Sequence, residues 1–226
     1  MVCCGRDVRD RWSVDKSPPV YNFATMTRKA EISFKRARSE EQRAQRRQVI
    51  LATAAAMLAE MPVTELSLNE LSRRVGLAKS NVLRYFESRE AVLLELLDAE
   101  LLAWIEAVQK LPLRSGGTPR DRGDHLAAAM VAELVRRPVL CDLIGAQAGV
   151  LERNVSTEIA LSHKRANLDA VRAITAVILA HLPEFTEGDA IKVFAYFLLM
   201  TSAAWRSARR PARRRRKGRS PPGSIS

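Results

Sequence analysis

The sequence predicts an all-α fold with an N-terminal three-helix helix-turn-helix domain followed by a longer C-terminal helical domain. Two short helical patterns stand on either side of the turn Gly76-Leu77-Ala78, which is the arrangement of a helix-turn-helix. Downstream, apolar residues recur every three or four positions, the period of amphipathic helices. A length of 226 residues is enough for two such parts and can bury a substantial core.

The first helix is expected to begin at Ser39, since Ser39 and Gln42 have the spacing of a capping box, and to end before Pro62. Residues 1–38 have no sustained apolar period and contain Pro18-Pro19, so we interpret them as a disordered basic extension. The expected domains are therefore the extension 1–38, the helix-turn-helix domain 39–87, the helical domain 88–207 and a basic disordered tail 208–226.

The second helix carries a signal at each of its ends. Ser67 lies three residues before Glu70, which is the spacing of a capping box at a helix start. Leu71 and Val75, four positions apart, share one face of this helix and can pack on a core. Gly76 stands where the helix must end and reverse direction, a position that favours a positive φ and therefore a residue without a Cβ.

The third helix has one apolar and one polar face. Val82 and Phe86 are four positions apart and are expected to anchor it on the core. The opposite face can hydrogen-bond base edges or phosphate oxygens, through Lys79, Ser80, Asn81 and Arg84. This arrangement favours binding to double-stranded DNA.

The C-terminal domain is expected to begin with a long helix that Ser88 caps and that ends near Pro112. Its apolar stripe consists of Leu93, Leu97, Leu101, Trp104 and Val108. A loop rich in Gly, Pro and Arg follows over 112–123. Further helices are expected over 124–136, from Pro138 through 144–152, over 156–182 with Leu168, Val171, Ile174 and Ile178 facing inward, and over 187–207.

The last of these helices is apolar on two sides. Its first side carries Ile191, Phe194, Leu198, Thr201 and Trp205, and its second carries Val193, Tyr196, Phe197 and Met200. A helix that is apolar around most of its circumference must be buried on more than one side. The second partner is either a symmetry mate or the rest of a monomeric core, and the pattern leaves both open.

Residues 39–97 resemble the DNA-binding domain of the TetR family of bacterial transcriptional repressors. In that family the turn and third helix read approximately G-V-S-x-G-T-L-Y-x-Y-F, followed by x-S-K-E and a Leu. The residues here that match are Gly76, Leu77, Val82, Tyr85, Phe86, Ser88, Arg89, Glu90 and Leu93, with Arg46, Ile50, Ala54 and Leu58 in the first helix. The alternative is an unrelated three-helix core with the same spacing, since short motifs also match by chance.

The resemblance implies a transcription regulator that binds double-stranded DNA, and we assign roles within its head. Base reading is assigned to Lys79, Ser80 and Asn81, and phosphate binding to Arg46, Arg84, Tyr85 and Arg89. The chain departs from the family at three positions. Ala78 replaces Ser, which removes a side-chain N-cap at a cost of about 1 kcal/mol. Leu83 replaces Tyr and Asn81 replaces Thr, so we expect a different operator sequence.

The resemblance also implies a homodimer formed by the last two helices, with two recognition helices about 34 to 36 Å apart and an inverted-repeat operator. The dimerisation residues are expected to be Ile191, Phe194, Leu198, Thr201 and Trp205. A small apolar or amphipathic effector is expected to bind in the helical body and release the DNA. Its candidate pocket residues are Trp104, Asp142, Gln147, Phe194 and Tyr196.

The charge is concentrated in two segments. The formal net charge is +12, of which residues 206–226 contribute nine basic and no acidic side chains. Residues 28–47 hold eight basic and three acidic side chains, and they lie immediately before the helix-turn-helix. This second segment can run along phosphates and add a salt-dependent term to DNA affinity, or it is a solvated lead without contacts.

The remaining signals exclude several classes of protein. Cys3, Cys4 and Cys141 do not have the spacing of a disulfide framework or a zinc site, which fits a reducing cytoplasm. The N-terminus has no apolar signal segment, and the apolar run 190–205 is too short for a membrane span. The three histidines are isolated, and we find no phosphate loop, metal-ligand cluster or nucleophile-base pair. We therefore expect a cytoplasmic protein that is not an enzyme and has no cofactor.

Both ends of the chain raise alternatives. Met26 begins a stretch typical of a start in this family, so we expect residues 1–25 to derive from an upstream start codon. The sequence after Trp205 has no apolar period. It is interpreted either as a basic tail that adds non-specific DNA affinity or as the product of a shifted reading frame in a G+C-rich gene. The alternative functions are a non-specific basic nucleic-acid-binding protein, a dimerisation-defective regulator with an altered C-terminus, and a small helical enzyme.

Overall fold

The computed structural model describes residues 23–113, 116–147 and 154–208, with side chains described from residue 40. The described residues form helices and no strands, in agreement with the predicted all-α fold. They fall into two compact units that divide between Gln45 and Arg46, so each unit is described by itself. Residues 1–22, and the tail from residue 209, where a disordered extension and a disordered tail were predicted, lie outside the described residues.

Helix α1 (Phe23–Glu60) begins well before the predicted start at Ser39. The prediction that the extension is disordered up to residue 38 is therefore wrong for residues 23–38, and Ser39 and Gln42 do not cap a helix. The physical reason is that no Gly or Pro interrupts the stretch, of which half the residues are Ala, Arg or Lys. Ile50, Ala54 and Leu58 on the C-terminal part are buried, as their spacing predicted.

The helix-turn-helix is formed by α2 (Leu68–Val75) and α3 (Lys79–Val82), with the 3-10 turn η1 (Val63–Glu65) before them. Oγ of Ser67 accepts a hydrogen bond from the Glu70 N–H at 3.2 Å, which confirms the predicted cap. Gly76 adopts φ 74° and ends α2 in the left-handed region, also as predicted. Ala78 gives α3 no side-chain cap, and α3 is only four residues long.

The C-terminal part comprises α4 (Arg89–Gln109), α5 (Pro119–Val135), α6 (Pro138–Ala146), α7 (Thr157–His181) and α8 (Glu187–Ala208). Ser88 caps α4 through a hydrogen bond from Ala91 N–H, and Pro138 begins α6, both as predicted. Ser156 caps α7 through a hydrogen bond from Ile159 N–H. Helix α5 begins earlier than the predicted residue 124, because Thr118 and Asp121 form a reciprocal capping box.

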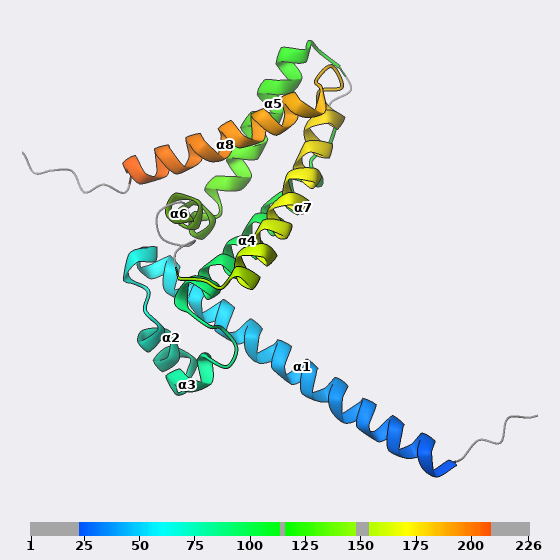
Figure 1. Cartoon of the computed structure of the whole chain (residues 1–226). Coiled ribbons are helices and arrows are strands. Elements are labelled where there is room, and N and C mark those ends of the chain that lie inside the picture. The colour runs from blue at the N-terminus through cyan, green and yellow to red at the C-terminus, as the bar shows by residue number, and fades with distance from the viewer. Residues whose placement is uncertain (1–22, 114–115, 148–153, 209–226) are drawn as a thin grey trace, which may run out of the picture. The chain divides into compact units, whose positions relative to one another are not determined.

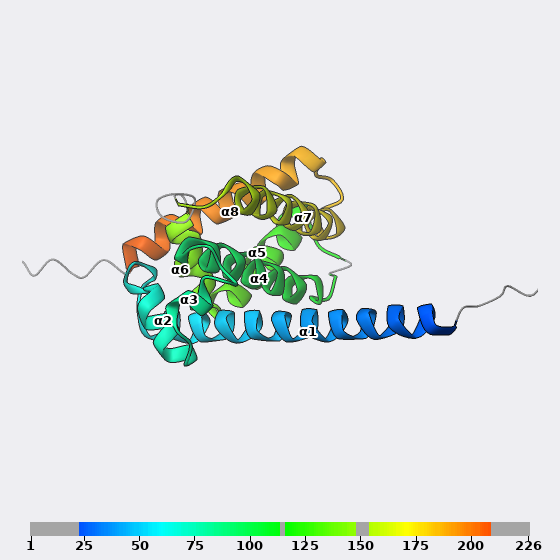
Figure 2. The ribbon, with the colours of Figure 1, turned by 60° about the horizontal axis from the view of Figure 1, so that its bottom comes forward.

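Helix α4 lies alongside α7, and α8 packs on both α6 and α7 (Figure 1; Figure 2 gives a second view). Trp104 of α4 is fully buried at the centre of this body. Its ring stacks on Phe197 with a centroid separation of 5.4 Å and on Phe194 with 6.3 Å. The aromatic cluster therefore ties α4, which leads out of the helix-turn-helix, to α8.

The inward set predicted for α7 needs one correction. Ile174 and Ile178 are fully buried, and Val171 packs against the core. Leu168 is instead 56% exposed. Leu168 therefore lies on the outer side of α7, away from the core of the subunit.

Among the described residues, no helix combines the length and the apolar character that crossing a membrane requires.

Candidate functional site

Helix α3 presents the polar face that the sequence predicted. Lys79, Ser80 and Asn81 are exposed, whereas Val82 is fully buried beneath them. Phe86, in the turn that follows α3, is 2% exposed and anchors the same core. The three polar side chains are therefore held at the surface by an apolar support, which is the arrangement a base-reading helix requires.

Four of the predicted DNA contacts surround one hollow of about 290 Å³. Arg46 of α1 and the residues Asn81, Arg84 and Tyr85 at and after α3 line it, together with Leu77 of the turn. Arg46 and Arg84 are exposed, so their guanidinium groups can reach a ligand. Guanidinium donors are well suited to phosphate oxygens because they donate in a planar fork.

Arg89 does not share this exposure. Its Nη1 donates to the carbonyl of Leu66 at 3.1 Å, and its Nε lies 3.2 Å from Oε1 of Glu90. The side chain is 22% exposed. Its guanidinium is therefore less accessible to a phosphate than those of Arg46 and Arg84, because it is hydrogen-bonded to a backbone carbonyl within the head.

Arg47 was not singled out from the sequence, although it organises the head. Its Nε donates to Oε1 of Glu95 at 2.8 Å, its Nη1 to the carbonyl of Tyr85 at 2.5 Å, and its guanidinium carbon lies 4.2 Å from the centroid of the Phe86 ring. It thereby fixes the segment after α3 to α1 and α4. Its place three residues before the buried Ile50 was the signal that could have revealed it.

A surface ion-pair cluster joins α1 to α2. Glu70 accepts from Arg73 at 2.6 Å and from Arg74 at 3.0 Å, and Arg74 also pairs with Glu60 of α1 at 2.7 Å. Hydrogen bonds from Arg73 and Arg74 lower the pKa of the Glu70 carboxyl to about 2. The first helix of the motif therefore keeps this carboxylate charged at any physiological pH.

The five residues proposed for an effector pocket do not line one cavity. Trp104 and Phe194 are buried in the aromatic cluster, and Nε1 of Trp104 donates to the Met130 carbonyl at 3.3 Å. Asp142 is buried in α6, while Tyr196 is 65% exposed on α8. Helical spacing predicted that these residues belong to the C-terminal domain, but it did not show which of them are buried in its core and which are exposed.

Gln147, the fifth, belongs to a polar cluster at the buried His163 of α7. Nδ1 of His163 lies 2.6 Å from Oδ1 of Asp98 on α4, and its Nε2 lies 3.1 Å from Nε2 of Gln147 and 3.0 Å from Nδ2 of Asn167. The ring thus bridges the Asp98 carboxyl on one side and two side-chain amides on the other. Burial raises the pKa of the Asp98 carboxyl, and the hydrogen bond from His163 offsets part of that rise.

An apolar groove of about 400 Å³ lies instead between α5, α6 and α8. It is lined by Val131, Leu134, Val135, Cys141, Phe197, Met200, Thr201, Ala204, Trp205 and Ala208. Burial raises the pKa of the Cys141 thiol, which therefore stays protonated and behaves as an apolar side chain. Such a surface suits the hydrocarbon part of a small molecule.

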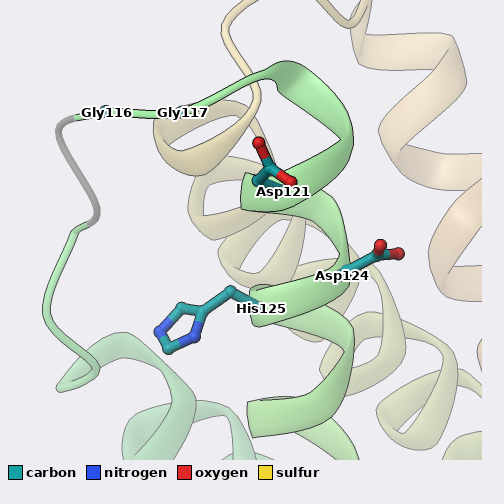
Figure 3. A pocket seen from close by; sticks show the side chains of 5 residues that line it. All are labelled: Gly116, Gly117, Asp121, Asp124 and His125. Carbon is teal, nitrogen blue, oxygen red and sulfur yellow. The ribbon is translucent and has the colours of Figure 1, made fainter.

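A second hollow, of about 640 Å³, lies at the start of α5 and is lined by Gly116, Gly117, Asp121, Asp124 and His125. Figure 3 shows that the side chains of Asp124 and His125 point in different directions. Oδ2 of Asp121 accepts from the N–H of Thr118 at 2.9 Å and so serves the helix cap. No group of three potential metal ligands occurs among the described residues.

The residues predicted for dimerisation divide between the two sides of α8. Phe194 is buried within the subunit, and Leu198 and Trp205 pack partly on the same core. Phe194 is therefore a core residue rather than an interface residue, because Trp104 occupies the space beside it. The exposed apolar side chains of α7 and α8 are Leu161, Leu168, Ile191, Val193, Tyr196, Leu199 and Met200.

Comparison with known families agrees with this architecture. The family model for a tetracyclin repressor-like C-terminal domain matches residues 98–219, which is more than half of the chain. The model for bacterial regulatory proteins of the tetR family matches residues 50–96. The two matches meet within α4, close to the predicted domain boundary.

The HTH-type transcriptional regulator EthR of Mycobacterium tuberculosis is 36% identical over 72 residues, which cover 32% of this chain and 33% of EthR. The chain therefore aligns with about a third of the length of this relative.

Two solved structures share the fold. A TetR transcriptional regulator from Rhodococcus sp. RHA1 has a TM-score of 0.52 at 15% identity, covering 73% of this chain and 85% of its own. The fatty acid degradation regulator FadR from Bacillus halodurans has a TM-score of 0.51 at 12% identity, covering 73% of this chain and 87% of its own. With both family models matching in sequence order, the chain belongs to the TetR family of DNA-binding transcription regulators, which are not enzymes.

Proposed function

We propose that this regulator is a repressor that binds an inverted-repeat operator as a homodimer and leaves it when a small apolar molecule binds the body. The observation that carries the DNA-binding part is the exposed polar face of α3 beside the hollow lined by Arg46, Asn81 and Arg84. Base edges and phosphates can be contacted together from such a surface, since the polar face and the guanidinium groups lie on the same side of the head.

Within this surface, Lys79, Ser80 and Asn81 read base edges, whereas Arg46, Arg84 and the Tyr85 hydroxyl hold phosphates. Arg89 supports the head through the Leu66 carbonyl and is removed from the proposed phosphate contacts. The altered residues at the family positions, Ala78, Leu83 and Asn81, make the operator sequence specific to this chain.

The proposed dimer interface is the exposed apolar side of α7 and α8. Tyr196 and Leu199 are 65% and 61% exposed, and Leu168 on α7 adds a third large apolar side chain. Contact with a second copy would cover these residues and pair the two recognition helices about one turn of duplex apart. Leu198 and Trp205 pack partly on the core of the subunit, and Thr201 and Trp205 line the groove between α5, α6 and α8.

The proposed effector site is the apolar groove between α5, α6 and α8, in place of the five residues expected from the sequence. Its volume of about 400 Å³ lies in the range of small-molecule sites. The side chains that line the groove are almost all apolar, so the effector is expected to be largely hydrocarbon. The switch available to such a molecule is its difference in affinity between the DNA-bound and free forms of the protein.

The experiment is selection from a random duplex library at physiological salt, with the full chain and with a variant ending at Ala208. Enrichment of the same inverted repeat by both proteins supports a specific dimeric regulator. Binding that disappears on truncation and enriches no sequence supports the alternative, a non-specific binder that acts through the eight basic residues after Ala208. Asn81→Ala then tests base reading, because it should change the enriched sequence rather than the overall yield.

A further inference from the structure

Asp142 is a buried carboxylate that joins two distant parts of the chain. Its Oδ2 accepts from the backbone N–H of Val63 at 3.1 Å, and its Oδ1 accepts from Nε1 of Trp205 at 3.1 Å. Asp142 is 9% exposed and Val63 3%. Both oxygens of one carboxylate are thus engaged by donors that lie 79 and 63 residues away in sequence.

The two donors belong to the two functional parts of a regulator. Val63 lies in η1, inside the match to the DNA-binding family model, whereas Asp142 and Trp205 lie inside the match to the C-terminal model. Trp205 also lines the apolar groove, next to Cys141, the neighbour of Asp142 in α6. One side chain therefore connects the groove wall to the head by a chain of two hydrogen bonds.

We infer that Asp142 couples the position of the Trp205 indole to the position of η1, and so transmits the state of the groove to the DNA-binding head. The inference rests on the proposed function, in which the groove receives the effector. A molecule that displaces the indole removes one donor from a carboxylate that is mostly shielded from water. The remaining hydrogen bonds of the carboxylate then rearrange, and its hydrogen bond with the Val63 N–H changes with them.

A second polar link between the two parts shows why burial matters. Oε1 of Glu87, just after α3, accepts from the N–H of Ser156 at 2.6 Å at the start of α7. Both residues are exposed, so water replaces this hydrogen bond at little cost. Water has less access to Asp142, so the loss of a hydrogen bond at one of its oxygens alters the hydrogen bond at the other.

The experiment is hydrogen exchange of the Val63 amide in the free full-length protein, compared between wild type and Trp205→Phe. The substitution keeps an aromatic ring but removes the indole donor. We expect exchange at Val63 to accelerate about tenfold, as for a loss of about 1.4 kcal/mol of local protection. Ser207→Ala is the matched control, because it removes a hydroxyl from an exposed residue of the same helix.

Amides of the α7 core, such as that of Ile178, show whether the whole subunit has lost stability, and Val63 is scored relative to them. Asp142→Asn serves as the reference for a disrupted link. If Trp205→Phe leaves Val63 exchange within about twofold of wild type while Asp142→Asn accelerates it, Asp142 merely anchors the head and the coupling is refuted. The measurement needs no DNA, so failure to select an operator would overturn the proposed function without deciding the coupling.

Discussion

The surface of α3 and the outer surface of α7 and α8 expose opposite kinds of side chain. Helix α3 exposes a lysine, a serine and an asparagine, with arginines beside them. Helices α7 and α8 expose leucines, a tyrosine and a methionine, of which Met200 is 68% accessible. The surface of α3 is complementary to a polyanion. The surface of α7 and α8 is complementary to another apolar surface, since a soluble monomer rarely leaves a patch of large apolar residues uncovered.

The largest expected effect comes from placing a charge in the apolar surface. Leu199→Glu would bury a carboxylate from each subunit in the proposed interface and leave it without water, and Leu199 does not line the groove. We expect dimer dissociation to become at least about 100-fold easier, the range of an interface hot spot, with operator affinity falling as well. Sedimentation velocity over a concentration series measures it.

Leu113→Glu provides the matched control, because Leu113 is 59% exposed but lies outside α7 and α8. It should leave sedimentation unchanged. A Leu199→Glu protein that sediments as the wild type would place the interface on another surface.

The next effect distinguishes two adjacent arginines of α1. Arg47 holds Glu95, the Tyr85 carbonyl and the Phe86 ring, so Arg47→Ala leaves a half-buried carboxylate and a carbonyl without this donor. We expect a loss of roughly 2 kcal/mol in the free energy of unfolding, as for a charged hydrogen-bonding partner. Urea denaturation measures the loss.

Arg46→Ala is the companion variant, since Arg46 is exposed and lines the hollow beside α3. It should change stability by less than about 0.5 kcal/mol but weaken DNA binding. Equal destabilisation by the two substitutions would mean that Arg46 has a structural role as well.

How much of this could be predicted from the sequence depends on how local the cause is. Gly76 and the caps Ser67 and Ser88 act through neighbours within four residues, and the structure has them as predicted. Phe194 was assigned to an interface, although it packs on Trp104, ninety positions away in sequence. The period of α8 identified two apolar sides, but only tertiary packing decides which one the subunit itself covers.

The same reason explains the arginines. A basic residue next to a helix-turn-helix is equally consistent with phosphate binding and with an internal hydrogen bond to a carbonyl. Arg89 bonds to Leu66 and Arg47 to Tyr85, and in both cases the acceptor is a backbone carbonyl that no side-chain pattern reveals. The hollow around Arg46 and Arg84 likewise depends on how α1 meets α3.

Within the polar surface, base reading and phosphate binding should respond differently to salt. Arg84→Ala is expected to weaken all duplexes alike and to reduce the slope of log affinity against log salt by about one. Asn81→Ala should leave the slope nearly unchanged and reduce discrimination between operator and random duplex. Fluorescence anisotropy over a salt series measures both quantities, and a change in slope with Asn81→Ala would contradict the division of roles.

The smallest expected effect lies in the ion pairs that surround the polar surface. The pKa of Glu70 is lowered to about 2 by Arg73 and Arg74, so the folded state keeps the carboxylate charged at pH values where the unfolded state binds a proton. Its contribution to stability is therefore complete above its ordinary pKa of about 4.3 and is lost as the pH falls through about 2. We expect the stability advantage of wild type over Glu70→Gln to be constant above about pH 5 and to shrink below it.

Because Glu70, Arg73 and Arg74 lie at the surface, the advantage should also decrease in about 1 M salt, where charges are screened within roughly 3 Å. Urea denaturation at a series of pH values, with the exposed Glu65→Gln as control, tests this. An advantage that persists undiminished in acid would mean that the Glu70 side chain stabilises the start of α2 by packing and hydrogen bonding rather than by charge. The polar surface of the head would then be held in place by packing and neutral hydrogen bonds rather than by ion pairs, and in this respect it would resemble the apolar surface of α7 and α8.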